Sequence, residues 1–160
     1  MTTLKADGLV LREWEDTDAT ALVAIYQDPA MRHWLRNQVT TPEEATAWVA
    51  LQQEGWATGT RHSFAVLDDD GLVGCVVLKQ RLEVGYWTAA HARGRAVATR
   101  AVRGLVAWAF DNGATTLEVR HQVDNEPSCR VAEKAGFRLR ETLPAAPPWP
   151  LPGHLHIRTP

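Results

Sequence analysis

The chain has 160 residues, of which 45% are hydrophobic and 22% are charged, and its formal net charge is −2. A chain of this size and composition buries its own core as one domain, residues 1–160, and extensive disorder is excluded. The near-neutral charge argues against nucleic acids and membrane surfaces as partners, because both attract strongly basic proteins.

The two cysteines, Cys75 and Cys129, lack partners at metal-ligand spacing and are too few for a disulfide framework. No segment is as long as a membrane span, and the first residues lack the apolar stretch of a signal peptide. We therefore expect a cytoplasmic protein with free thiols.

Local signals predict alternating helices and strands. Asp28-Pro29 should end the first helix, because a residue before proline is pushed out of the helical region. Thr41-Pro42 should open the second, with threonine as the cap and proline in the first turn. In chain order the predicted elements are a strand at 9–14, helices at 21–28 and 41–52, strands at 61–67, 72–78 and 83–87, a helix at 98–112, a strand at 115–121, a helix at 125–136, and strands at 137–143 and 154–158. This order predicts one mixed α/β domain.

Residues 91–99 join a predicted strand to a predicted helix. Main-chain N–H groups at a helix start lack internal partners and carry the positive end of the helix dipole. Gly94 and Ala96 are small enough for an anion to approach the main chain, and Arg93 and Arg95 add positive charge. The pattern favours a phosphate or pyrophosphate site, with a solvated basic helix start as the alternative.

Several segments that occur in order resemble the GNAT superfamily of acyl-CoA N-acyltransferases, and most of all its ribosomal-protein N-terminal alanine and serine acetyltransferase branch. They are VGYW at 84–87, ARGRAVAT at 92–99, NEPSCRVAEKAGF at 125–137, and the openings at 11–18 and 28–32. His91 and the proline-rich stretch 144–152 depart from the family pattern. The resemblance implies an α/β (α+β) fold with a mixed, twisted central sheet of about six to seven strands and flanking helices.

The resemblance also implies acetyl-CoA as the acetyl donor and assigns residues to it. Main-chain groups around Trp87, Thr88 and Ala89 would pair with the pantetheine arm, as a strand edge can. Asn125 would hydrogen-bond this arm, and Phe137 would pack near it. The pyrophosphate would lie on the loop formed by Arg93, Gly94, Arg95, Ala96, Val97, Ala98 and Thr99.

Acetyl transfer to an amine needs a base for the amine, a donor for the oxyanion and an acid for the leaving thiolate. Glu83, at the start of the strand that leads into the loop, is the first candidate base, and an exposed acid without a catalytic role is the alternative. His121 competes for this role, and Glu118 is a weaker third candidate. A backbone N–H near Trp87 is the expected oxyanion donor.

Ser128 lies in the first turn of the helix that is expected to flank the sulfur, three residues after Asn125. Its hydroxyl is the candidate acid for the thiolate, and helix-start hydrogen bonding is the alternative. Cys129 is expected to pack, because direct transfer needs no covalent enzyme intermediate. His154 and His156 could face one side of a strand, but with no third ligand in view we predict no metal site.

Two aromatic residues and one proline-rich segment have open roles. Trp34 and Trp56 would either line the acceptor pocket or close the core, and the core is favoured. Pro144–Pro152 could be a lid, a polyproline ligand for a partner or a stiff connector, and the connector is favoured.

Together these features predict an N-acetyltransferase that moves the acetyl group of acetyl-CoA directly to a primary amine in a ternary complex. The acceptor would be a protein N-terminus or an amine-bearing metabolite or antibiotic. The alternative is a non-catalytic acyl-CoA-binding sensor on the same fold. A homodimer fits the pattern of such folds, because two-fold dimers are the commonest soluble oligomers.

Overall fold

The computed structural model describes all 160 residues, which form eight strands and five α-helices. The strands are β1 (Thr3–Ala6), β2 (Leu9–Glu13), β3 (His62–Asp68), β4 (Gly71–Leu78), β5 (Val84–Thr88), β6 (Leu117–Gln122), β7 (Arg138–Leu143) and β8 (Gly153–Arg158). The helices are α1 (Ala19–Ile25), α2 (Pro29–Trp34), α3 (Pro42–Thr58), α4 (Val97–Asp111) and α5 (Glu126–Lys134).

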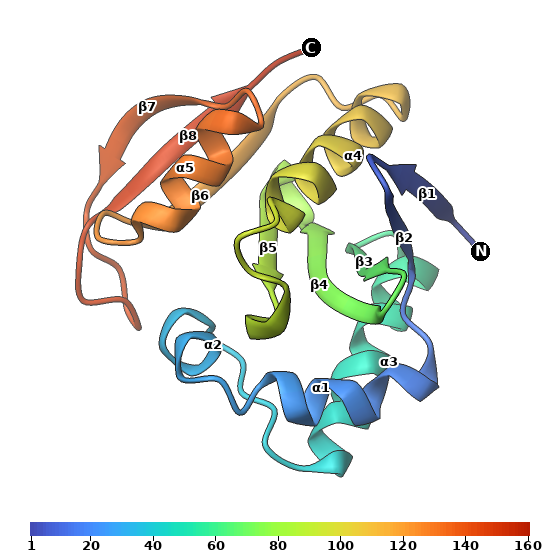
Figure 1. Ribbon diagram of the computed structural model, residues 1–160. Coiled ribbons are helices and arrows are strands. Elements are labelled where there is room, and N and C mark those ends of the chain that lie inside the picture. Colours follow the sequence, from blue (N-terminus) through green and yellow to red (C-terminus); the bar gives the residue numbers. More distant parts are fainter.

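The strands form two antiparallel sheets that meet at one point (Figure 1). The first sheet has the order β1-β2-β3-β4-β5, and the second has the order β6-β8-β7. A single parallel bridge between Glu83 and Glu118 joins β5 to β6, and beyond it the two strands diverge. The expected mixed α/β fold is confirmed, with eight strands divided between two sheets.

Helices cover both faces of the five-stranded sheet. On one face α4 packs against β1, β2, β4 and β5, and its side chains Val102 and Leu105 are fully buried in the larger core. On the other face α1 and α3 enclose a smaller core that includes Trp14 and Trp48. Trp56 packs against the larger core, as favoured for this residue. No helix has the combination of length and apolar character that spanning a membrane requires.

Two elements in the first half were not predicted. The first helix ends at Ile25, three residues before the expected stop at Asp28-Pro29. Asp28 instead caps α2 through its side chain, and Pro29 occupies the first turn of that helix, so these two residues start a helix. The edge strand β1 leads into a tight turn to β2, in which Asp7 and Gly8 have φ values of 48° and 82°. Its four residues pair with β2, and so short a strand has little pattern of its own.

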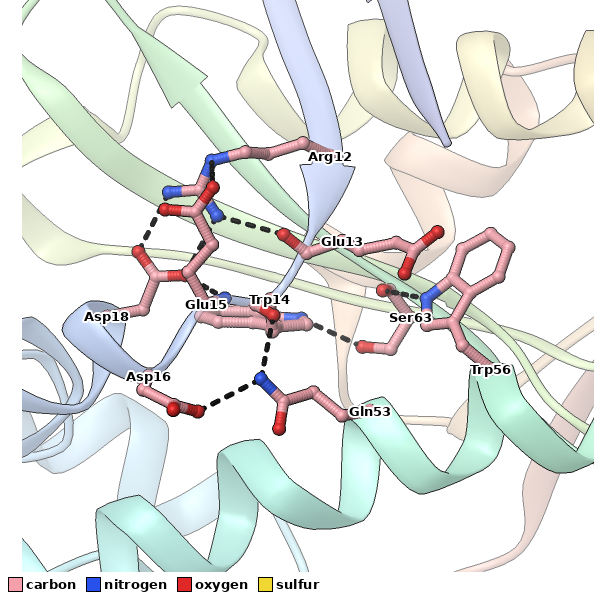
Figure 2. A network of polar contacts seen from close by, with 9 residues as sticks. All are labelled: Arg12, Glu13, Trp14, Glu15, Asp16, Asp18, Gln53, Trp56 and Ser63. Atoms are coloured by element: carbon pink, nitrogen blue, oxygen red, sulfur yellow. Dashed lines mark hydrogen bonds and ion pairs between the residues drawn. The ribbon is translucent and has the colours of Figure 1, made fainter. Parts of the chain in front are cut away.

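A polar network fixes α1 and α3 against the end of β2 (Figure 2). Arg12 donates two hydrogen bonds of 2.9 Å to the carboxylate of Asp18, which lies just before α1. Gln53 of α3 donates to the carbonyl of Trp14 and to Asp16. These contacts hold the N-terminal helices beside the first sheet.

We expect Asp18→Asn to lower the free energy of unfolding by about 2 kcal/mol. The substitution removes the closer charged partner of the largely buried Arg12 guanidinium and leaves only Glu15 at 3.7 Å. Asp16→Asn is the matched control, because Asp16 makes only an exposed contact and should cost less than about 0.5 kcal/mol. Urea unfolding measures both changes, and equal effects would contradict this assignment.

Candidate active site at the divergence of β5 and β6

The edge of β5 that faces β6 carries free main-chain groups beyond the bridge at Glu83. Antiparallel partners alternate between hydrogen-bonded and non-bonded pairs. The main-chain N–H of Ala89 donates to the carbonyl of Val73, and the carbonyl of Glu83 accepts from the main-chain N–H of Lys79. By this alternation, the main-chain groups of the odd-numbered residues of β5 bond to β4. The main-chain N–H and C=O groups of Trp87 therefore point to β4. Those of Tyr86 and Thr88 point away from β4, toward the divergence from β6. This outer edge can accept an extended ligand as an added strand.

This register refines the expected main-chain contacts. Trp87 and Ala89 direct their amides to β4 and do not offer them to the divergence. The main-chain groups of Thr88 and Tyr86 lie on the open edge instead. The sequence implies that alternate residues of β5 bond to β4. Which alternate set does so depends on the register of the two strands, and the turn between them does not fix this register.

The loop after β5 opens the start of α4 to an anion. Gly94 has a φ of 81°, and Ala96, which precedes the helix, has a left-handed φ of 55°. No side chain caps α4. The first N–H groups of the helix are therefore available to a ligand, and the helix dipole makes their surroundings positive. Gly94 is exposed, and a Cβ built on it would meet no atom within 4 Å.

The two arginines of the loop make ion pairs with other elements. Arg93 pairs with Asp28, the capping residue of α2, and lowers the pKa of that carboxyl through its hydrogen bond. Arg95 lies 3.2 Å from Asp68 at the end of β3. Each guanidinium is nearly half exposed and keeps further N–H donors, so both arginines add positive charge beside the main-chain amides of the loop.

Across the divergence, β5 and α5 meet through two hydroxyl groups. The hydroxyl oxygen of Tyr86 lies 2.7 Å from Oγ of Ser128 and 2.8 Å from its carbonyl oxygen. Burial raises the pKa of Tyr86 to about 12, so this phenol keeps its proton at neutral pH. Asn125 caps α5, because its Oδ1 atom accepts a hydrogen bond of 3.2 Å from the main-chain N–H of Ser128. The Nδ2 group of Asn125 stays free to donate.

An extended edge, an uncapped helix start and a hydroxyl pair together suit a long anionic ligand with a reacting group at its far end. The family model described as acetyltransferase (GNAT) domain matches residues 8–138 of the chain. The chain belongs to this GNAT acetyltransferase family. It is therefore an acetyltransferase, as the sequence predicts.

Solved structures of other acetyltransferases share the whole fold. RimL, a ribosomal L7/L12 α-N-protein acetyltransferase in complex with coenzyme A, superposes with a TM-score of 0.90 at 17% identity, over 99% of this chain and 98% of that one. The Salmonella typhimurium acetyltransferase that modifies the N-terminal serine of a 50S ribosomal subunit protein gives 0.87 at 17% identity, over 99% of both chains. MccE, a self-immunity acetyltransferase in complex with acetyl-CoA and AMP, gives 0.85 at 16% identity, over 96% and 93%. A comparison with curated protein sequences gives no match.

Two of the three candidate bases of this GNAT acetyltransferase lie together, and the third lies apart from them. Glu83 and Glu118 face each other at the bridge, where the divergence of β5 and β6 begins. Each carboxylate has a basic neighbour, Lys79 at 3.5 Å from Glu83 and Arg120 at 3.1 Å from Glu118. His121 lies at the other end of β6, and burial lowers its pKa.

The remaining expected residues fall into two groups. Phe137 is 3% exposed and belongs to the larger core, so its ring contributes packing and presents little surface to a ligand. Val97 and Thr99 are buried under the start of α4, whereas Ala98 is partly exposed. Trp34, in contrast to Trp56, stays outside both cores and packs edge-on against His33.

Proposed function

We propose that this acetyltransferase transfers the acetyl group of acetyl-CoA directly to a primary amine in a ternary complex. The observation that carries the proposal is the pairing of an open β5 edge with an uncapped α4 start, separated by the left-handed residues Gly94 and Ala96. The pantetheine arm would extend along Tyr86 and Thr88, and the pyrophosphate would rest on the amides of residues 94–99. Nδ2 of Asn125 would donate to the same arm.

The chemical steps follow from the groups around this edge. The amine nitrogen attacks the thioester carbon, and a main-chain N–H of β5 donates to the oxyanion that forms. The carbon–sulfur bond then breaks, and the thiolate takes a proton from the hydroxyl of Ser128. Tyr86 keeps its own proton, which it donates to the carbonyl of Ser128, and its hydroxyl oxygen lies 2.7 Å from Oγ. As negative charge develops on Oγ, the phenol would turn its proton to Oγ and stabilise that charge. Glu83 removes the proton of the attacking amine, directly or through water.

The acceptor would be a protein N-terminus or a small amine. RimL and the Salmonella typhimurium enzyme act on ribosomal-protein N-termini, which supports the first class. The helices α1 and α2 lie near the end of β5 that leads into the loop (Figure 1), and an acceptor would approach β5 from this end. The ion pair between Arg93 and Asp28 links the loop to α2. It would therefore connect the proposed acetyl-CoA site to the helices near the proposed amine site.

The test is to incubate the chain with acetyl-CoA and a panel of amines, which includes peptides that begin with alanine or serine, and to measure released thiol. We expect thiol release that depends on the amine. Binding of acetyl-CoA without thiol release from any amine would instead favour the acyl-CoA sensor. Failure of acetyl-CoA to raise the melting temperature would contradict both functions.

We expect Glu83→Gln to lower kcat about tenfold and to leave the Kd of acetyl-CoA unchanged. The amide cannot accept the proton of the amine, but water can replace it in part. Glu118→Gln is the matched control, because Glu118 lies directly across the bridge with a similar basic neighbour. Steady-state kinetics against pH would show the loss, and a larger loss in Glu118→Gln would reassign the base.

A further inference from the structure

Four metal-ligating side chains gather where α5 covers the ends of β6 and β8. His121 comes from β6, His154 and His156 come from β8, and Cys129 comes from α5. Their donor atoms, one from each residue, all lie within 4.8 Å of one another. The strand register produces this gathering, because His121 lies opposite His154 and His156 lies opposite Val119, so that all face the same side.

Hydrogen bonding within the cluster is incomplete. His121 donates its Nδ1–H to the carbonyl of Gln122 at 2.7 Å, so its Nε2 atom presents a lone pair. Nε2 of His156 lies 2.9 Å from that atom and 3.8 Å from Sγ of Cys129. The Nδ1 atoms of His154 and His156 are buried and have no hydrogen-bond partner. Buried ring nitrogens without partners are rare, and here they show that hydrogen bonds within the protein leave the cluster incompletely satisfied.

We propose that His121, Cys129, His154 and His156 bind one divalent late transition-metal ion, with Zn²⁺ as the best fit. Three imidazoles and one thiolate form a donor set of the kind that holds zinc tetrahedrally. Bonds of about 2.0 to 2.3 Å separate tetrahedral donors by about 3.3 to 3.8 Å, so small side-chain rotations close the present spread of 4.8 Å. The contact from His121 to Gln122 is the outer support that metal-bound histidines generally have.

The surroundings of the cluster are mostly buried. His156 is 0% exposed and His121 is 9% exposed, so two of the four donors are shielded from solvent. The carboxylate of Glu133 lies 3.7 Å from the thiol of Cys129 and would add negative charge near a cation. Cys129 is only partly buried, which gives an ion a route into the cluster.

The ion would tie α5 to the second sheet. Cys129 directly follows Ser128, so its coordination would hold the first turn of α5 and the Ser128 hydroxyl beside Tyr86. Four protein donors complete a tetrahedral shell and leave no open position, which makes the ion structural. Coordination would also occupy His121 and remove it as a candidate base. The sequence predicts no metal, because the pair His154 and His156 lacks a third ligand until the fold supplies two.

The experiment uses untagged, chelator-treated protein titrated with Zn²⁺ and, separately, with Co²⁺ as a spectroscopic probe. We expect one ion per chain, the visible bands of tetrahedral Co²⁺ with a thiolate charge-transfer band, and a higher melting temperature with Zn²⁺. These readouts need no acetyl-CoA, so their outcome is separate from that of the proposed function.

Cys129→Ala and His154→Ala change the two partly exposed ligands and should each weaken Zn²⁺ binding at least about a hundredfold. Cys129→Ala should also abolish the charge-transfer band. His33→Ala and Cys75→Ala lie outside the cluster and should leave binding unchanged. Wild-type protein that takes up no stoichiometric ion would overturn the proposal and leave a hydrogen-bonded imidazole pair. Unchanged affinity in both ligand variants would overturn it as well.

Discussion

Gly94→Val should weaken acetyl-CoA binding about ten- to a hundredfold. The Cβ of a residue at this position meets no protein atom within 4 Å, so the added side chain projects into the space that the proposed function gives to the pyrophosphate. Loss of one charge-assisted hydrogen bond costs about 1.5 to 3 kcal/mol, which corresponds to a change of this size. Isothermal titration with acetyl-CoA measures it.

Backbone strain requires a matched control, because Gly94 has a φ of 81° and valine resists positive φ. Gly113, at the other end of α4, has a φ of 95° and an equally open Cβ direction. Gly113→Val should therefore lose similar stability while it binds acetyl-CoA normally. Equal loss of affinity in both variants would assign the effect to strain, and the loop would then not be the pyrophosphate site.

Ser128→Ala should lower kcat about a hundredfold without a change in the Kd of acetyl-CoA. The proposed chemistry requires a proton for the thiolate at the moment of cleavage, and a positioned acid contributes at least about this factor. Ser128→Thr keeps the hydroxyl and should restore most of the rate. A kcat of Ser128→Ala equal to that of the wild type would contradict a catalytic role for this hydroxyl, and its contact with Tyr86 would then be structural.

Tyr86→Phe separates the two hydroxyls of that contact. If Tyr86 acts through Ser128, its loss should reduce kcat in the wild-type background and have little further effect in Ser128→Ala, as coupled residues do. Because the pKa of Tyr86 is raised to about 12, the phenol stays protonated throughout the neutral range. The rate should then show no loss from tyrosine ionisation below about pH 11. Additive losses in the double variant would contradict this coupling.

The sequence alone determined the features that depend on neighbouring residues. Thr41 and Pro42 begin α3, Asn125 and Pro127 begin α5, and Gly94 adopts the positive φ that glycine permits. Such signals are local, because a cap or a positive φ is set by the side chains within one turn. The family assignment came from the resemblance of the segments 84–87, 92–99 and 125–137, and the family model that matches residues 8–138 confirms it.

The tertiary structure decided which distant residues meet. Tyr86 and Ser128 lie 42 positions apart, and their contact exists only because α5 packs across from β5. The register between β4 and β5 decides that the main-chain groups of Trp87 point to β4. A shift of one residue would point them to the open edge instead. His121 joins His154 and Cys129 because β8 inserts beside β6, a choice of strand order that no local pattern encodes.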